Sequence, residues 1–329
     1  MVAVSVVRTD EHDPLAGIEV GERPEPVAAD GWTVVTVRAA SLNHHDLWTL
    51  RGTGLLGSAP LPRILGSDAA GTDEEGNEVL VHSVVAGAGW HGDETLDPGG
   101  TMLSDVHDGT LATRVAVPRR NLVPKPAALS FEEAACLPTA WLTAYRMLFR
   151  HANVLPGATV LVQGAGGGVA TAAIMLGTAA GLRIWVTSRS EEKRARARAL
   201  GAEQAFESGA RLPERVDAVL ETVGAATWSH SLKVLKPGGT IVLAGTTTGG
   251  DPPAGLHRIF MTKLRVVGTT LGTRDELDLL ARFCAQQGIH PPIHAVLPLA
   301  DAVEGFRLME SGELFGKIVL RPPQLSAPE

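Results

Sequence analysis

The stretch "VLVQGAGGGVATAA", residues 160–173, decides the fold. An apolar run leads into a turn of small residues and then into a helix-forming segment, which predicts strand, turn and helix in that order. As A-x-G-x-x-A, the turn places Ala165, Gly167 and Ala170 where a dinucleotide fingerprint needs small residues. The N-terminus of the helix would offer free N–H groups to a pyrophosphate. The residues expected to bind a dinucleotide here are Ala165, Gly166, Gly167, Gly168 and Val169.

The same alternation of strand and helix continues along the chain after this turn. Strands are predicted at 183–188, 216–222, 240–245 and 264–270, and helices at about 169–180 and at 191–200, 226–235 and 256–263. Such alternation implies right-handed crossovers and a parallel sheet covered on both faces. We therefore expect residues 126–269 to form a doubly wound nucleotide-binding domain.

The first 125 residues show a different pattern, one of short strands without intervening helices. Short β-rich runs, among them "WTVVTVRAA" (32–40) and "LATRVAVP" (111–118), are separated by Gly, Pro and Asp, the spacing of antiparallel strands. The polar, glycine-rich residues 85–108 are expected to form a surface lobe or lid. A helix over 274–287 and the stretch after it lack the βα rhythm and are expected to rejoin the first half. The predicted fold is α/β, with a β-rich domain of residues 1–125 and 270–329 around the doubly wound domain.

Composition and charge exclude several classes of function. With 29 basic and 36 acidic residues, a net charge of −7 and no basic block, the chain lacks the electrostatic footprint of a nucleic-acid-binding protein. No apolar run reaches the roughly 20 residues that a membrane span requires. The two cysteines, Cys136 and Cys284, and a start without a secretory pattern favour a reducing compartment. We expect a soluble, cytoplasmic protein that acts on a small molecule.

The choice between NADPH and NADH depends on the end of the second predicted strand of the doubly wound domain, "VTSRSEEK" (186–193). A carboxylate there would accept a hydrogen bond from an NAD ribose, but this strand ends in Ser188 and Arg189, with Lys193 one helical turn later. A hydroxyl and two cations suit the 2′-phosphate of NADPH. The alternative is that Arg189 and Lys193 are ordinary solvated residues whose charge Glu191 and Glu192 partly offset.

A second polar cluster, "SLNHHDLW" (41–48), follows an apolar run in the first half. His44 and His45 are adjacent, so on an extended strand their side chains would point to opposite faces and could not both bind one metal ion. Asp46 is expected to anchor the turn through backbone N–H groups rather than to take part in chemistry.

Seven motifs in order resemble the medium-chain dehydrogenase/reductase superfamily and together cover nearly the whole chain. The resemblance implies a GroES-like catalytic domain, an inserted Rossmann domain, an active site in the cleft between them, and a homodimer built through the Rossmann sheets. The motifs are "SLNHHDLWTLRG" (41–52), "ILGSDAAG" (64–71), "LPTAWLTAYRML" (137–148), "GAGGGVATAA" (164–173), "SLKVLKPGGTIVLAG" (231–245), "VVGTTLGTRDEL" (266–277) and "SGELFGKIVL" (311–320).

The resemblance also locates the positions that bind catalytic zinc in one branch of the superfamily. Those positions hold Asn43, Ser67 and Thr139 here, so the Cys and His ligands that zinc prefers are missing. The four structural cysteines that many zinc relatives carry in the lobe are missing between Val85 and Asp108 as well. We therefore expect no metal.

Residues near Asn43 take their expected roles from the same resemblance. His44 would contact the cofactor pyrophosphate, and His45 would face the substrate and donate the proton that follows hydride transfer. Two alternatives remain: His45 is a hydrogen-bonded wall of the pocket, or water or a substrate hydroxyl relays the proton. Trp48 would form an apolar wall for a flat substrate, and the pocket shape would also depend on Leu55. The candidate catalytic-site residues are Asn43, His45 and Trp48.

The nicotinamide end of the cofactor is assigned to two further segments. Thr143, in the helical "TAYRML", is the expected nicotinamide contact, whereas Tyr145 is expected to pack. Gly245 and Thr246 follow a strand of the doubly wound domain, at the sheet edge where ligands collect.

The function that these patterns favour is an NADPH-dependent, zinc-independent reductase of quinones, enones or related conjugated carbonyls. Two alternatives stay open. One is an alcohol dehydrogenase with an unfamiliar metal arrangement, and the other is a protein that binds NADPH without catalysis.

Overall fold

The structure is a computed structural model that describes residues 1–53 and 60–323. The chain divides into two units. Unit 1 comprises Met1–Thr139 and Thr273–Glu329, and unit 2 comprises Ala140–Gly272.

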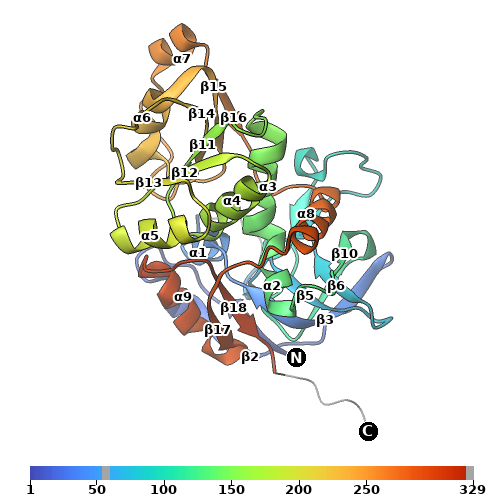
Figure 1. The fold of residues 1–329 in the computed structure, drawn as a ribbon. Coiled ribbons are helices and arrows are strands. Elements are labelled where there is room, and N and C mark those ends of the chain that lie inside the picture. The colour runs from blue at the N-terminus through green and yellow to red at the C-terminus, as the bar shows by residue number, and fades with distance from the viewer. Residues whose placement is uncertain (54–59, 324–329) are drawn as a thin grey trace. The chain divides into compact units, whose positions relative to one another are not determined.

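Unit 2 contains a parallel sheet whose strand order is β13-β12-β11-β14-β15-β16 in the part of the chain that the structure describes. Helices α4 and α5 pack on β11–β13, and α6 and α7 pack on β14 and β15 (Figure 1). The strands are β11 (Thr159–Gln163), β12 (Arg183–Thr187), β13 (Gln204–Phe206), β14 (Val216–Glu221), β15 (Leu235–Leu243) and β16 (Arg265–Gly268). The helices are α3 (Leu142–Arg146), α4 (Gly168–Ala179), α5 (Glu191–Ala199), α6 (Ala225–Val234) and α7 (Leu256–Thr262).

The doubly wound fold predicted from the sequence is confirmed. Apolar residues from strands and helices, among them Leu161, Trp185 and Trp228, form the core of the sheet. The sequence reading missed β13, because "QAF" is too short for a periodic signal.

Unit 1 is mostly antiparallel sheet, as expected. Its largest sheet has the order β10-β6-β5-β3-β18-β17, with β9 also paired to β3, and smaller sheets pair β2-β1-β4 and β7-β8. The strands are β1 (Val2–Val6), β2 (Ile18–Glu22), β3 (Trp32–Ser41), β4 (Arg63–Ile64), β5 (Ala69–Thr72), β6 (Glu78–Val81), β7 (Val84–Val85), β8 (Thr101–Met102), β9 (Arg114–Pro118), β10 (Leu122–Pro124), β17 (Ile293–Pro298) and β18 (Lys317–Arg321). The α-helices are α1 (His44–Leu50), α2 (Phe131–Ala135), α8 (Arg274–Gln287) and α9 (Ala302–Glu310).

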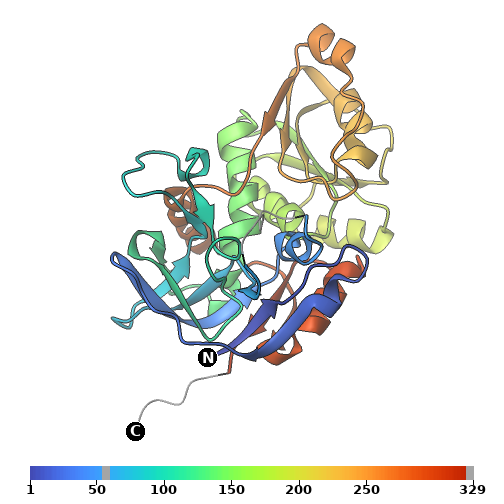
Figure 2. The same ribbon diagram turned by 180° about the vertical axis from the view of Figure 1, so that it is seen from behind.

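The C-terminal segment completes this largest sheet. β18 pairs antiparallel with β3, with Val319 opposite Ser41, and β17 runs parallel to β18 (Figures 1 and 2). α9 buries Phe306 and Met309 in the core of unit 1. Residues 126–139, which the sequence texture grouped with the second domain, lie in unit 1 because α2 packs on β3 and β5.

The lobe expected over residues 85–108 is only partly a surface feature. β7 and β8 pair across it, with Val84 opposite Met102. Leu103, Ser104 and Asp105 are buried, so the prediction of a surface segment is wrong for these three residues. The physical reason is that the chain turns inward after β8, where the Leu103 N–H donates to the Ser83 carbonyl at 3.0 Å. None of the described helices is long and apolar enough to cross a membrane.

Candidate active site

The "NHHD" segment begins helix α1 and is not extended, so the strand geometry expected for His44 and His45 is wrong. The reason is a helix start: Asn43 is the N-cap, and the Asp46 carboxylate accepts its backbone N–H at 2.9 Å. Successive side chains on a helix point about 100° apart around its axis, so the His44 and His45 side chains diverge on the helix as well. The His44 ring stacks near Trp48 with centroids 6.5 Å apart, whereas His45 lies against Asp105.

Asp46 anchors this turn, as the sequence indicated. Its fully buried carboxylate also accepts the Gly66 N–H at 3.0 Å, which joins α1 to the loop before β5. Burial raises the pKa of Asp46 to about 6, although the charge of His45 and the Asn43 amide act in the opposite direction. Its two backbone partners explain why an aspartate occupies a buried position.

Asn43, Ser67 and Thr139, the three positions that match zinc ligands, lie together in unit 1. The Asn43 side-chain amide lies 3.4 Å from the Ser67 hydroxyl, and the Ser67 and Thr139 hydroxyl oxygens are 3.1 Å apart. The sequence reasoning therefore grouped three residues that the fold does bring into contact.

A buried cation adjoins this chain of polar groups. The Lys317 ammonium donates to Asn43 Oδ1 at 2.6 Å and to the Leu42 carbonyl at 2.7 Å, and it lies 3.2 Å from the Asp68 carboxylate. Asp68 also accepts from the Asn43 amide at 2.9 Å and from the Ser41 hydroxyl at 2.6 Å. The Lys317 and Asp68 side chains are 3% and 0% exposed, so this ion pair is shielded from water.

This arrangement is a poor fit for zinc. An amide and two hydroxyls replace the thiolate and imidazole ligands, and a buried ammonium bound to one of them repels a dication. Among residues 1–53 and 60–323, no group of three or more His, Cys, Asp or Glu side chains could hold a metal ion. In the lobe, His107 bonds to the Thr101 hydroxyl at 2.9 Å instead.

His45 and Asp105 form a second buried pair in unit 1. His45 Nε2 lies 3.4 Å from Asp105 Oδ1, and the two side chains are 14% and 4% exposed. Burial by itself lowers the pKa of the His45 imidazole, but the carboxylates of Asp105 and Asp46 outweigh it and raise the pKa above the ordinary value of 6.5. The two carboxylates therefore favour the protonated form of the imidazole.

Trp48 is half-buried on α1, and Leu55 lies outside the described residues. Thr143 is 7% exposed on α3, and Tyr145 packs edge-on against Phe149 with centroids 4.8 Å apart.

The glycine-rich turn has the geometry that a dinucleotide needs. It connects β11 to α4, and Gly167 is the N-cap of the 12-residue helix. Gly167 has φ −75°, which any residue can adopt, and a Cβ there would meet no protein atom within 4 Å. Since the fold itself does not require a glycine, the open space at this helix N-terminus fits a pyrophosphate.

The end of β12 presents the predicted polar residues. Ser188 is nearly buried and its hydroxyl accepts the Ser190 N–H at 3.2 Å, whereas Arg189 is exposed and makes no hydrogen bond or ion pair with any described residue. Glu191 pairs instead with Arg194 and Arg198. Gly245 and Thr246 follow the end of β15, at the carboxyl edge of the sheet as expected.

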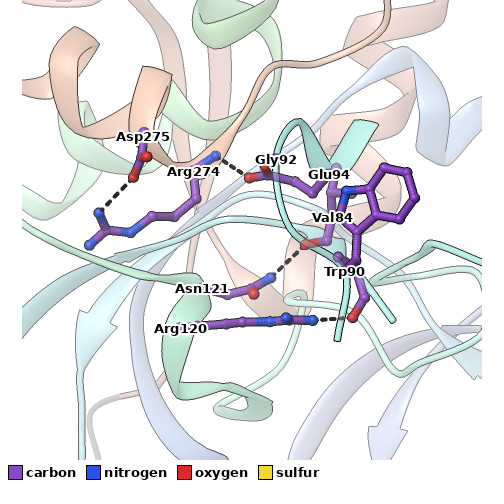
Figure 3. Close-up of a pocket in the computed structure, with 9 residues that line it drawn as sticks. Val84, Trp90, Gly92, Glu94, Arg120, Asn121, Arg274 and Asp275 are labelled. Carbon is purple, nitrogen blue, oxygen red and sulfur yellow. Dashed lines mark hydrogen bonds and ion pairs between the residues drawn. The ribbon is translucent and has the colours of Figure 1, made fainter. Parts of the chain in front are cut away.

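A separate pocket lies between the lobe and the rest of unit 1 (Figure 3). It encloses about 160 Å³, below the roughly 300–1,000 Å³ of typical small-molecule sites. Its polar groups bond to one another: the Arg274 N–H donates to Glu94, the Arg274 guanidinium pairs with Asp275, and the Asn121 amide donates to the Val84 carbonyl (Figure 3). These contacts tie the lobe to β10 and α8, so we assign the pocket a structural role.

Comparison with known proteins is consistent with both units. Residues 29–127 match the family model described as alcohol dehydrogenase GroES-like domain, and residues 168–286 match the one described as zinc-binding dehydrogenase. The chain is 30% identical over 336 residues to the zinc-type alcohol dehydrogenase-like protein YogA of Leptosphaeria maculans, covering 90% of this chain and 92% of that protein. The chain belongs to the medium-chain dehydrogenase/reductase superfamily.

Members of the superfamily with other names are also similar. The acryloyl-coenzyme A reductase of Metallosphaera sedula is 28% identical, with 92% of this chain and 96% of that protein covered. A crystal structure of an NAD-dependent alcohol dehydrogenase superposes with a TM-score of 0.90 at 32% identity, covering 98% of this chain and 99% of the other. This superfamily member is an oxidoreductase that uses a nicotinamide cofactor.

The sequence analysis gave no role to three residues of the site, Asp68, Asp105 and Lys317. Asp105 lies in an irregular turn, and Asp68 and Lys317 are 249 residues apart. The usable signal was local: Asp68 follows Ser67, and Lys317 belongs to "FGKIVL", a segment that carried the resemblance but received no role.

Proposed function

We propose that this protein is an NADPH-dependent, zinc-independent reductase of quinones, enones or related conjugated carbonyls. The observation that carries the proposal is the buried Lys317 ammonium, 2.6 Å from Asn43 Oδ1 at a position that matches a zinc ligand. A catalytic zinc ion acts as a Lewis acid on an alkoxide or a carbonyl oxygen, whereas reduction of a conjugated acceptor can proceed with a hydride and a proton donor. The similarity to an acryloyl-coenzyme A reductase supports the same class of acceptor.

Each unit would supply one part of the chemistry. The bound cofactor supplies the hydride. His45 would donate the proton to the substrate, and Asn43, held by Lys317 and Asp68, would keep the polar wall of the site rigid. Trp48 would exclude water as an apolar wall. On the cofactor side, the proposed contacts are His44, Thr143, Gly245, Thr246 and the turn 165–169.

NADPH is the proposed cofactor because of the charges at the end of β12. Ser188, Arg189 and Lys193 can meet a 2′-phosphate, and no carboxylate ends this strand. Glu191 pairs with Arg194 and Arg198, and Glu192 pairs with Arg196, so neither is an ion-pair partner of Arg189. These pairings argue against the alternative in which the two glutamates offset the charge of Arg189.

The test is turnover by metal-stripped protein. Protein dialysed against a strong chelator and assayed for metals should contain well under one zinc per chain and should still oxidise NADPH with a quinone, an enone or an enoyl thioester. Stoichiometric zinc that resists chelation, or activity lost with the metal, would contradict the proposal.

The same test can also support either of two other functions. The likeness to an NAD-dependent alcohol dehydrogenase favours alcohol oxidation with NAD⁺ as a second candidate, which predicts activity on simple alcohols and dependence on added metal. Tight NADPH binding without turnover of any acceptor in the panel would favour a binding protein.

A homodimer formed through unit 2 is part of the proposal. β16 ends the sheet of unit 2, and α7 nearby exposes Leu256, Phe260 and Met261, which are 70%, 63% and 58% exposed. Exposed apolar side chains of this size mark association surfaces. Phe260→Lys combined with Val266→Lys should convert a dimer to monomers in sedimentation experiments, whereas a wild-type monomer would contradict this part.

A cytoplasmic location completes the proposal. Cys136 and Cys284 are free and buried, and burial raises the pKa of Cys284 to about 12. Buried, unreactive thiols without a disulfide are what a reducing compartment favours. Fractionation of cells should place the protein with cytosolic markers.

A further inference from the structure

Asp105 and His45 are two ionisable groups of unit 1 whose side chains are 4% and 14% exposed and lie against each other. Their contact, Nε2 to Oδ1, is 3.4 Å long. Neither ring nitrogen of His45 nor Asp105 Oδ1 makes a hydrogen bond with any described residue. Asp46, the other carboxylate that acts on His45, is already bound by the backbone N–H groups of Asn43 and Gly66. Buried polar atoms without partners are rare, so this pair requires an explanation.

The turn that carries Asp105 is built to bury it. The Ser104 N–H donates to the His107 carbonyl at 2.9 Å, and the Asp105 N–H donates to the Met102 carbonyl at 3.3 Å. Ser104 has φ +75°, a left-handed conformation that is unfavourable for a residue with a side chain. Strain of this kind persists where the surroundings enforce it, commonly at functional sites.

We propose that Asp105 is the positioning residue for His45: its carboxylate holds Nε2 of the imidazolium and leaves Nδ1 to donate the proton to the substrate. The proton-donating step rests on the proposed reductase function. The contact between the His45 and Asp105 side chains is independent of that function.

The step balances without any further reactant. A bound nicotinamide cofactor would supply the hydride to the conjugated C=C bond of the substrate. His45 would supply the proton, its Nδ1–H bond breaking as the substrate bond to hydrogen forms. The neutral imidazole then takes a proton from water. The adjacent Asp105 carboxylate stabilises the charged ring before the transfer.

The His45–Asp105 pair determines how turnover depends on pH. Burial lowers the pKa of His45, and the Asp105 and Asp46 carboxylates raise it by more. A donor must be protonated to act, so turnover is retained up to the raised pKa and falls as the pH rises through it. Removal of the Asp105 charge moves this fall to lower pH.

The first experiment is an NMR titration of the imidazole, which needs no turnover. With 13C-labelled histidine, the His45 signal among the 11 histidines is assigned by its loss in His45→Gln. We expect a wild-type pKa above 6.5 and a lower pKa in Asp105→Asn, because the substitution removes the neighbouring negative charge. The matched control is Asp108→Asn in the same turn, where the carboxylate is 53% exposed and pairs with Arg63; it should leave the His45 pKa unchanged.

The second experiment is the pH profile of kcat. In Asp105→Asn the alkaline limb should move to lower pH, with a loss of roughly tenfold for each unit by which the His45 pKa falls, while the KM for NADPH stays unchanged. Asp105→Glu, which keeps the charge, should restore much of the wild-type profile. A loss of folding alone would lower kcat at all pH values and would not be rescued in this way.

The outcomes separate the inference from the function. A wild-type His45 pKa at or below the ordinary value, or one that Asp105→Asn does not change, would overturn the role of Asp105 even if the enzyme reduces every acceptor. A wild-type protein that reduces none would overturn the proposed function, while the titration would still decide whether the two side chains are coupled.

Discussion

Each unit of this protein contains a buried carboxylate with several partners, and the two differ in where those partners come from. Glu221 of unit 2 accepts the N–H groups of Val223 and Gly224 and the hydroxyls of Thr227 and Ser231, all within ten residues. Asp68 of unit 1 is bound by Ser41, Asn43 and Lys317, which lie 27, 25 and 249 residues away.

The difference shows how each site is assembled. In unit 2 the strand ends and helix starts that form the dinucleotide turn are local, so a short motif contains most of the site. In unit 1 the polar cluster around Asp68 forms only after distant strands have paired, because Lys317 lies on β18 and Asn43 follows β3. If the two sites act separately, substitutions in unit 1 should mainly change catalysis, and substitutions in unit 2 should mainly change cofactor binding.

The largest effect is expected at His45. If His45 donates the proton, His45→Gln should lower kcat by roughly 10²–10⁴ with nearly unchanged NADPH affinity. His44→Gln should do the reverse, weakening NADPH binding with a smaller effect on kcat. Steady-state kinetics and cofactor titration of both variants decide between them. Near-normal turnover of His45→Gln with an unaltered pH profile would leave the proton to water.

Removal of the Lys317 charge should destabilise unit 1 strongly. Lys317→Met leaves the buried Asp68 carboxylate without its cation, which should cost roughly 3–5 kcal/mol in the free energy of opening of the β18 amides. Hydrogen exchange followed by mass spectrometry measures this locally.

A more exposed pair provides the control for Lys317. Lys236 lies 2.8 Å from Asp217 and is 44% exposed, so Lys236→Met should change the opening of β15 by only about 0–1 kcal/mol. Equal effects of the two substitutions would contradict the expected difference between a buried and an exposed ion pair.

The next largest effect concerns cofactor choice. Arg189→Ala should raise the Kd for NADPH by roughly 10- to 100-fold, because a charge-assisted contact to the 2′-phosphate is lost, and should change the Kd for NADH much less. Arg196→Ala, which removes the same charge further along α5, is the control and should change neither. Equal losses for both cofactors in Arg189→Ala would show that Arg189 does not read the phosphate.

The smallest expected effect separates binding from folding. Gly167→Ala meets no protein atom, so the stability of unit 2 should change by less than about 0.5 kcal/mol, while dinucleotide affinity falls roughly tenfold. Gly177→Ala in the same helix would collide with Ile184 and should lower the melting temperature. A Gly167→Ala protein that binds NADPH normally would show that the pyrophosphate lies elsewhere.

How far the sequence predicts this molecule follows from the same contrast. The strand, turn and helix around Gly167 and the alternation of strands and helices in unit 2 can be predicted, because periodicity and glycine spacing act over a few residues. The sequence singled out His45 as a candidate proton donor, which stays a prediction, but its helical setting was missed. Two histidines after an apolar run look like the end of a strand until the capping role of Asp46 is recognised. Asp105 was hidden in a polar segment expected at the surface, because no local pattern reveals a turn that folds inward.

The pairing of β3 with β18 has a consequence for biosynthesis. The sheet of unit 1 lacks its C-terminal strands until residues 317–321 have left the ribosome, whereas every strand of unit 2 lies within one continuous segment. We therefore expect the usual N-terminal-first order of cotranslational folding to be inverted, with unit 2 complete before unit 1, which holds the proposed proton donor. On stalled nascent chains ending near residue 315, whose last segment is still inside the ribosome, NADPH should already protect unit 2 from protease while β3 is not yet paired with β18.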